Sequence, residues 1–329
     1  MLGKVVLTLV QDRDIGRYQA VSESVNLGAG SSSHREGTVK LMSWKSDETI
    51  VAMLPPDNHV HSQFSWDTRS NGSMELACAK AVELGLPAIA FTEHVDFTAW
   101  GHDDLPPLNG TQNISLAHRE RVQPLDVEAY QATIAECRDK YPQLRILTGI
   151  ETGEPHLFAG SVAQVLGSGV FERVLGSLHS VVYQGRILSP ERVFALGVAP
   201  EDAMRRYFEG LLDLIKGSDV FQVLAHCDFP RRYWPTGARP YDEALFEEEY
   251  RTVFRALATS GRALEINTRS PLWSVELMRW WYEEGGEAVS FGSDAHVPYR
   301  VGAQFELAVD VVEAAGFRPG RDQFDFWRR

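Results

Sequence analysis

The sequence predicts an α/β fold in which a parallel sheet is covered by helices and closes into a barrel. Three observations support this: seven short apolar segments of strand length, longer segments of helical periodicity between them, and polar residues at the carboxyl end of each apolar segment. Strands that alternate with helices form parallel sheets buried under helices. Seven units over roughly 280 residues suit a closed barrel better than an open doubly wound sheet, although periodicity alone allows both.

The expected strands surround His59 and then occupy residues 88–91, 145–147, 173–176, 220–224, 263–266 and 288–291. Three intervening segments, 127–141, 204–215 and 245–257, each have one apolar helical face. Asp126 can cap the first of these helices and Pro142 ends it. Residues 24–38 are rich in Ser and Gly, which indicates a linker or a mobile arm. We therefore divide the chain into an N-terminal extension, residues 1–50, and one domain, residues 51–329.

The composition excludes several classes of protein. Of the 329 residues 44% are hydrophobic, and 45 Asp and Glu stand against 32 Lys and Arg, for a formal net charge of −13. This is a globular composition, and its acidic balance argues against a nucleic-acid or membrane-surface binder. No segment reaches the roughly 18 apolar residues of a membrane span. Three cysteines do not make a disulfide framework, and a cytoplasmic location is expected.

Residues of the types that bind metals in proteins follow the apolar segments at their carboxyl ends. They are His59, His61, Glu93, His94, Glu151, His179, His226, Asp294 and His296. In parallel barrels and sheets the loops at this edge converge on one site. His59 and His61 are two residues apart, so on a strand both imidazoles project from the same face and can share an ion. Asp294 and His296 repeat this spacing.

These residue types predict a metal-dependent phosphoesterase. Imidazoles and carboxylates without thiolates suit Zn²⁺, Mn²⁺ or iron, whereas Ca²⁺ and Mg²⁺ prefer oxygen ligands. At roughly four to six ligands per ion, nine groups imply two or three divalent ions, and Glu151 is the natural bridge because its two oxygens can serve two ions. Such clusters hydrolyse phosphoesters because some ions make a hydroxide while others hold the phosphate oxygens.

Six separated motifs resemble, in type and order, those of the polymerase and histidinol phosphatase (PHP) superfamily. They are His59-x-His61, Thr92-Glu93-His94, Gly149-Ile150-Glu151, Leu178-His179-Ser180, Ala225-His226-x-Asp228 and Ser293-Asp294-x-His296. The likeness covers about residues 55–317. Segments 64–67, 226–232 and 265–268 are similar to the histidinol-phosphatase branch. The resemblance implies a distorted (β/α)7 TIM-like barrel of the PHP type with a trinuclear centre.

The resemblance also implies how the ligands are shared among the ions. The first ion takes His59, His61, Glu151 and Asp294, the second takes the bridging Glu151 with His179 and His226, and the third takes Asp67, His94 and His296. Glu151, Asp294 and His226 are the expected catalytic residues. The alternatives are that Asp67 caps a nearby helix or turn and that Asp294 only orients a histidine.

The implied reaction is hydrolysis of a small phosphomonoester, L-histidinol phosphate, by a metal-bound hydroxide. The expected substrate-binding residues are Arg231, Arg232, Arg269, Asn267 and Glu154. Arg231 or Arg232 can clamp phosphate, or the two form a solvent-facing pair. Arg269 is the weaker candidate, and Glu154 suits a solvated loop better than a substrate contact; His102 is expected to be a bystander. The alternatives are a PHP enzyme for another phosphomonoester or for nucleotide or oligonucleotide ends, and a non-catalytic metal-binding module.

Overall fold

The computed structural model describes residues 5–11, 18–24, 54–98 and 124–329, and the chain divides into two compact units, Met1–Ile50 and Val51–Arg329. The first unit contains an antiparallel hairpin of β1 (Val5–Gln11) and β2 (Tyr18–Ser24). Residues 25–38 of the Ser- and Gly-rich run lie outside the described residues.

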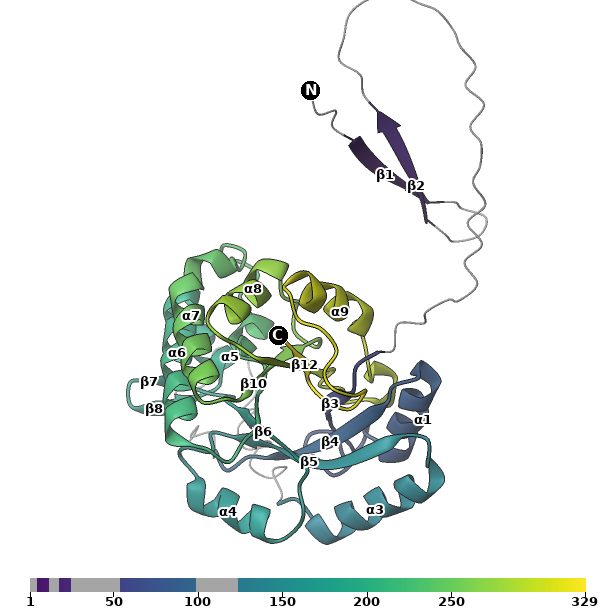
Figure 1. The fold of residues 1–329 in the computed structure, drawn as a ribbon. Helices are drawn as coiled ribbons and strands as arrows, with labels where there is room; N and C mark the ends of the chain where they lie inside the picture. The colour runs from purple at the N-terminus through teal and green to yellow at the C-terminus, as the bar shows by residue number, and fades with distance from the viewer. Residues whose placement is uncertain (1–4, 12–17, 25–53, 99–123) are drawn as a thin grey trace, which may run out of the picture. The chain divides into compact units, whose positions relative to one another are not determined.

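The second unit is built on a curved sheet surrounded by helices (Figure 1), with the strand order β12-β11-β10-β9-β6-β5-β4-β3. Seven parallel strands lie in its described part: β3 (Asp57–Val60), β4 (Ala88–Val95), β5 (Arg145–Gly153), β6 (Arg173–Ser177), β9 (Val223–Leu224), β10 (Ala263–Asn267) and β11 (Ala288–Gly292). A short antiparallel strand, β12 (Trp327–Arg328), pairs with β11. Every expected strand segment overlaps one of these parallel strands. The observed β4 and β5 extend well beyond the expected segments, whereas in 220–224 only the last two residues form a strand.

The sheet closes on itself where β3 meets the segment after β11. Val60 and Ala295 form a parallel bridge, and the Asp294 amide donates to the His59 carbonyl at 2.7 Å. Asp57 holds this seam from inside, because its buried carboxylate accepts the amides of Ser293 at 3.0 Å and Gly302 at 2.9 Å. Burial outweighs these hydrogen bonds and raises the pKa of Asp57 to about 6. The closure confirms the expected distorted TIM-like barrel.

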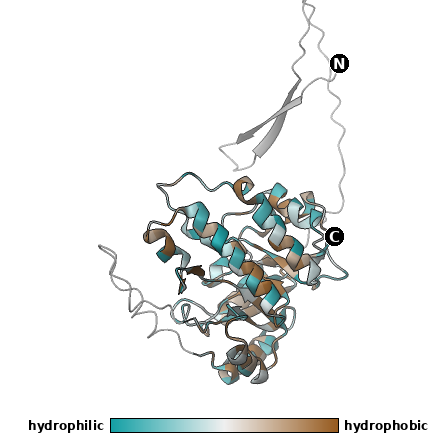
Figure 2. Ribbon diagram, turned by 90° about the vertical axis from the view of Figure 1, so that its left-hand side faces the viewer, coloured by the Kyte–Doolittle hydropathy of each residue, from teal (hydrophilic) through white to brown (hydrophobic). Residues whose placement is uncertain are grey.

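Each helix of the second unit buries some of its side chains, and Figure 2 shows hydrophilic and hydrophobic residues alternating along the helices. Their bounds are α1 (Met74–Leu84), α3 (Val127–Lys140), α4 (Ala159–Gly167), α5 (Pro190–Ala195), α6 (Pro200–Gly217), α7 (Glu247–Thr259), α8 (Val275–Glu283) and α9 (Phe305–Ala314). The 3₁₀ segments are η1 (Phe229–Tyr233), η2 (Glu243–Phe246) and η3 (Pro298–Arg300), and β7 (Val181–Tyr183) and β8 (Arg186–Leu188) form a hairpin. Within the described residues no helix is both long and apolar enough to cross a membrane.

The three predicted helices are present, with one corrected boundary. Asp126 caps α3 by accepting the Ala129 amide at 3.1 Å, and this helix ends before Pro142 as expected. The apolar face of the third predicted helix begins at Leu245, but α7 begins two residues later because Leu245 lies in η2. There Asp242 accepts the Ala244 amide at 3.2 Å and so caps a tighter 3₁₀ turn first.

The C-terminal residues pack against the amino ends of the strands, opposite the end where the polar motifs lie. Phe326 packs on a small apolar cluster of Leu175, Val223, Ala225, Ala263 and Ala288. The Arg173 guanidinium covers its ring at 4.3 Å from the centroid, and Trp327 packs on Phe291 at 5.1 Å. This contact closes one end of the barrel and leaves the carboxyl ends of the strands for a site.

Candidate metal centre

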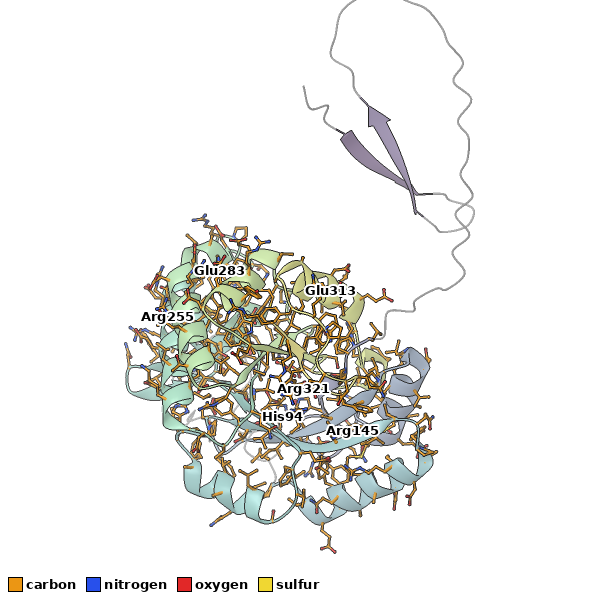
Figure 3. All side chains as sticks on the ribbon, viewed as in Figure 1. His94, Arg145, Arg255, Glu283, Glu313 and Arg321 are labelled. Carbon is orange, nitrogen blue, oxygen red and sulfur yellow. The ribbon has the colours of Figure 1, made fainter. Side chains whose placement is uncertain are left out.

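Side chains of metal-binding type from six of the seven parallel strands, or from the segments after them, converge at the carboxyl ends of the strands. The cluster contains all nine predicted ligands: His59, His61, Asp67, His94, Glu151, His179, His226, Asp294 and His296. In Figure 3, His94 lies inside the barrel, whereas Arg255 and Glu283 lie on the outside. Residues that are far apart in the sequence therefore lie together at the carboxyl ends of the strands, as the sequence predicts.

Glu151 is the centre of the cluster, and its two carboxylate oxygens face different histidines. Oε2 lies 3.0 Å from His94 Nδ1, 3.3 Å from His59 Nε2 and 3.5 Å from His61 Nε2. Oε1 lies 2.7 Å from His226 Nε2 and 3.2 Å from His179 Nε2. A carboxylate in this position can contribute one oxygen to each of two cations.

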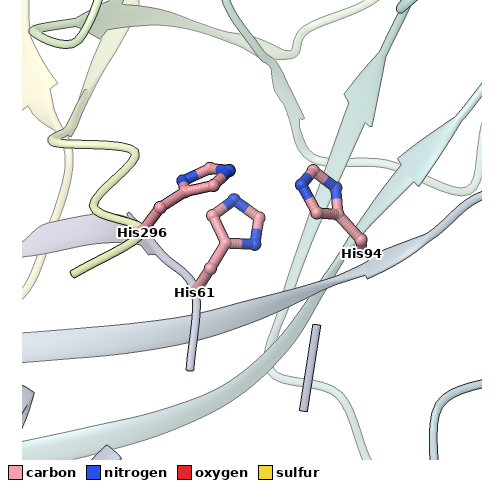
Figure 4. Close-up of side chains that lie close together, drawn as sticks. All are labelled: His61, His94 and His296. Atoms are coloured by element: carbon pink, nitrogen blue, oxygen red, sulfur yellow. The ribbon is translucent and has the colours of Figure 1, made fainter. Parts of the chain in front are cut away.

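The other two carboxylates, Asp294 and Asp67, both contact His296. Asp294 Oδ1 lies 3.4 Å from His61 Nε2 and 3.3 Å from His296 Nδ1. Asp67 Oδ2 lies 3.0 Å from His296 Nε2 and 3.6 Å from His94 Nε2. The imidazoles of His61, His94 and His296 come from three different segments and face one another (Figure 4), with the rings of His61 and His94 stacked at 4.1 Å.

The donor atoms fit divalent cations. Glu151 Oε2 is buried and accepts no hydrogen bond of ordinary geometry, which is costly for an oxygen shielded from water. The Nε2 atoms of His59 and His61 lie only 3.1 Å apart, so their lone pairs face each other unless a proton or a cation lies between them. Four sets of three residues hold their ligand atoms within 4.8 Å of one another. Imidazole and carboxylate donors in such sets suit Zn²⁺, Mn²⁺ or iron.

The charges of the buried carboxylates also favour the binding of cations in the cluster. Burial acts to lower the pKa of His59, but the carboxylates of Glu265 and Glu151 hold it well above its ordinary value. Burial acts to raise the pKa of Glu151, but the surrounding imidazoles of His59, His179 and His94 hold it well below its ordinary value. The carboxylates therefore keep their charge inside the barrel, where they attract cations.

Glu265 is a residue of the site that the sequence analysis did not single out. Its Oε1 lies 2.7 Å from His59 Nδ1, and its Oε2 accepts the His226 amide at 2.8 Å and the Asn267 amide group at 3.0 Å. A metal-binding histidine usually donates its second ring N–H to such a carboxylate. The sequence did contain a signal for Glu265, because it is an acid inside an otherwise apolar strand segment, two residues before Asn267.

Asp96 is a second such residue. Its Oδ1 lies 3.2 Å from His179 Nδ1, and its Oδ2 accepts the indole N–H of Trp66 at 3.0 Å. It follows His94 by two residues and so lies on the same face of the strand end, which is the spacing that identified the other pairs. The ring of His179 is thus held between Asp96 and Glu151.

The three arginines differ in what they contact. Arg231 lies 3.5 Å from Asp228 and covers the ring of Tyr241 at 4.8 Å. Arg232 donates to Asp294 Oδ2 at 2.7 Å, and it also bonds to Ser270 at 2.7 Å and to Asn267 at 3.0 Å. The alternative of a solvent-facing basic pair is wrong, because the two side chains are only 16% and 12% exposed.

Arg269, the weaker candidate, is also at the cluster. Its Nη1 lies 3.2 Å from Asp294 Oδ1 and 2.6 Å from His296 Nδ1, and the residue is exposed. Asn267 is buried and bonds to both Glu265 and Arg232. The two arginines that meet Asp294 are therefore next to the predicted ligands.

Glu154 differs from the expectation of a solvated loop carboxylate. It is fully buried and accepts the His179 amide at 2.8 Å, the Ser180 hydroxyl at 2.8 Å and the Thr98 hydroxyl. The reason is that β5 runs on to Gly153, so Glu154 directly follows the strand and is buried instead of lying in an open loop. His102 lies outside the described residues.

Comparison with known proteins finds similarity to histidinol-phosphatases in both sequence and fold. The PHP domain model matches residues 57–269. The histidinol-phosphatase of Lactococcus lactis is 29% identical over 79% of this chain and 91% of that protein, and the probable histidinol-phosphatase of Clostridium acetobutylicum is 24% identical over 80% and 94%. The crystal structure of L. lactis histidinol phosphate phosphatase complexed with Zn, L-histidinol and phosphate superposes with a TM-score of 0.67 at 26% identity, over 81% of this chain and 95% of that one. A putative histidinol phosphatase from Listeria monocytogenes shares the fold, with a TM-score of 0.63 at 18% identity over 77% and 99%.

Proposed function

The chain belongs to the PHP domain family, and from this premise we propose that it is a metal-dependent histidinol-phosphatase, which hydrolyses L-histidinol phosphate to L-histidinol and phosphate. The observation that carries the proposal is the position of Glu151, whose two oxygens face two separate groups of histidines inside one barrel end. The L. lactis relative crystallised with zinc, histidinol and phosphate supports the substrate and the metal.

The residues are assigned to two or three divalent ions, Zn²⁺, Mn²⁺ or iron. His59, His61, Glu151 and Asp294 hold the first, Glu151, His179 and His226 the second, and Asp67, His94 and His296 the third. Bound ions would supply Lewis-acid chemistry, which lowers the pKa of water enough to give hydroxide at neutral pH and neutralises the charge of the phosphate oxygens. Glu151, Asp294 and His226 are the catalytic residues of this proposal.

The arginines beside Asp294 are the phosphate-binding groups of the proposal. Arg232 is partly buried and its guanidinium is held by Ser270, Asn267 and Asp294, so its orientation is fixed before substrate arrives. Arg269 is exposed and can approach the phosphate from the solvent side. Phe229 stands 5.1 Å from the ring of His179 and 5.0 Å from that of His226, which gives the site an apolar wall that excludes water. Asn267 acts by holding Arg232, and Glu154 by holding the backbone of His179.

The proposed substrate is a small molecule. Neither nucleic acid nor membrane is a proposed partner, because a net charge of −13 disfavours binding to polyanions and to anionic membrane surfaces. A cytoplasmic location belongs to the same proposal. Cys78, Cys137 and Cys227 are buried free thiols, as is usual for a protein of a reducing compartment.

A substrate panel tests the proposal. The purified chain, loaded in turn with Zn²⁺, Mn²⁺ and Fe²⁺, is assayed for release of phosphate from L-histidinol phosphate, from nucleoside monophosphates and from a 5′-phosphorylated oligonucleotide. The expected result is a kcat/KM for L-histidinol phosphate at least tenfold above that of every other substrate. Preference for the oligonucleotide would replace this proposal with a nuclease-type activity, and absence of turnover with every metal would favour a metal-binding module without catalysis.

A further inference from the structure

Ser65 lies between two of the proposed ligands and a buried acid. Its Oγ is 3.0 Å from His61 Nδ1, accepts the backbone amide of His94 at 2.9 Å, and donates to Glu93 Oε2 at 2.6 Å. Ser65 and Glu93 are both fully buried. A hydroxyl has one proton and two lone pairs, so these three hydrogen bonds use its whole capacity.

With Glu93 as a carboxylate, one arrangement of protons satisfies these contacts. The carboxylate of Glu93 accepts from the Ser62 amide at 3.1 Å, from the Ser62 hydroxyl at 2.5 Å and from Ser65, so the proton of Ser65 points to Glu93. Ser65 Oγ must therefore accept from His61, whose Nδ1 carries the proton. The lone pair of His61 is then on Nε2, which is the atom that lies 3.5 Å from Glu151 and 3.4 Å from Asp294.

The same hydroxyl also sets the position of His94. Its bond to the His94 amide joins the end of β4 to the segment after β3, and the rings of His61 and His94 stack at 4.1 Å with an angle of 22° between their planes. One hydroxyl therefore determines the tautomer of one imidazole and the backbone position of its neighbour.

We propose that Ser65, held by Glu93, is a positioning residue of the metal centre that fixes the tautomer and orientation of His61 and the position of His94. Ser65 acts through these two histidines and does not itself contact metal or substrate. The inference rests on the metal centre of the proposed function.

Ser62 provides a matched control. It is fully buried, and its hydroxyl donates to the same Glu93 carboxylate, but its other hydroxyl contact is the amide of Phe64 at 3.4 Å rather than a proposed ligand. Ser65→Ala and Ser62→Ala therefore each remove one hydroxyl bonded to Glu93 from the same buried network. Only Ser65→Ala leaves the Nδ1–H of His61 without an acceptor.

The experiment measures zinc affinity of the full-length variants by competition with a chromophoric chelator, and the visible spectrum of the Co²⁺-loaded proteins. Ser65→Ala should bind zinc about 10- to 100-fold more weakly than the wild type and show a changed Co²⁺ spectrum, as for other residues that orient metal ligands. Ser62→Ala should stay within about twofold of wild type in zinc affinity and keep its spectrum, since no ligand loses a partner. Thermal unfolding of both metal-free variants checks that they fold and are destabilised to a similar extent.

Equal zinc affinity in the two alanine variants would overturn the inference, because the contact with His61 would then have no effect of its own. If Ser65→Ala does not fold, Glu93→Gln is the second variant, because its amide presents one oxygen and one NH₂ to three donors. We expect Glu93→Gln to bind zinc more weakly than wild type, by more than about twofold and up to about tenfold. An unchanged affinity in Glu93→Gln would also overturn it. A wild-type chain that binds no divalent ion would overturn the proposed function itself, and this inference with it.

Discussion

Glu265→Gln should loosen the metal centre without removing any proposed ligand. The carboxylate accepts from three donors, the ring of His59, the amide of His226 and the side chain of Asn267. A glutamine has the same shape but offers one acceptor and one donor. If its oxygen keeps the His226 and Asn267 side, its NH₂ faces His59 Nδ1 and forces the proton of that imidazole onto Nε2. Nε2 then has no lone pair for a metal.

The size of the effect follows from these bonds. A hydrogen bond to a charged acceptor contributes about 1.5 to 3 kcal/mol, so losing the His59 bond and weakening the other two should lower the free energy of unfolding of the metal-free protein by about 3 kcal/mol. The zinc affinity should fall about 10- to 100-fold, the range found for carboxylates that orient metal-bound histidines. Gly292→Ala should act on the same contact, because a Cβ there would lie 2.1 Å from Glu265 Oε1 and 2.7 Å from the Cβ of His59.

Denaturant unfolding and zinc competition measure the two effects separately, and Glu154→Gln is the control. Glu154 is equally buried and also accepts a backbone amide of a proposed ligand, but its bonds go to the His179 amide and to two hydroxyls rather than to an imidazole. Glu154→Gln should lose stability yet keep its zinc affinity within about threefold of wild type. Zinc binding by Glu265→Gln as tight as that of the wild type would refute the reasoning, since the tautomer of His59 would not depend on Glu265.

Three further substitutions probe other parts of the molecule. Glu151→Ala should reduce phosphate release to less than a tenth of wild type, a loss above about 1.4 kcal/mol, while the circular dichroism spectrum is kept; a higher residual rate would contradict the bridging role. Arg232→Ala should lower kcat/KM in steady-state assays about tenfold or more, and Arg231→Ala less than threefold, because Arg232 contacts Asp294 whereas Arg231 contacts Asp228; the reverse order would assign the phosphate to Arg231. Phe326→Ala should lower the free energy of unfolding by about 2 kcal/mol, since the ring is partly buried at the far end of the barrel, with kcat/KM unchanged; a loss of activity without a loss of stability would contradict this.

The strands could be predicted because they are buried on both faces. Ala88, Ile89, Ala90 and Phe91 are all buried, so the segment is apolar throughout and stands out in the sequence. The β7–β8 hairpin and β12 were not predicted, because they are short and partly exposed, and β12 forms by tertiary pairing of its two residues with β11. In segments this short, the strand propensity of the residues does not outweigh tertiary packing.

The site could be predicted where spacing decides which side chains share a face, and not where it depends on contacts across the barrel. The pairs at spacing two, such as His59 and His61, follow from the geometry of a strand. Arg231 and Arg232 are neighbours on the 3₁₀ segment η1, where successive side chains point about 120° apart, so only one of them can face the cluster and the sequence does not say which. The burial of Glu154 depends on the amide of His179, which belongs to a different strand end.

The metal centre and the closure of the barrel depend on the same segments. The first and last motifs, His59-x-His61 and Asp294-x-His296, are far apart in the sequence and meet only at the seam between β3 and the segment after β11. That seam has a single bridged pair, Val60 and Ala295, whereas β4 and β5 are paired along eight residues. A cation shared by His59, His61 and Asp294 would join the two sides of the seam where the backbone pairing is weakest. Since metal binding free energy adds to folding free energy when the site exists only in the folded chain, ions bound at such a centre would also hold the barrel closed.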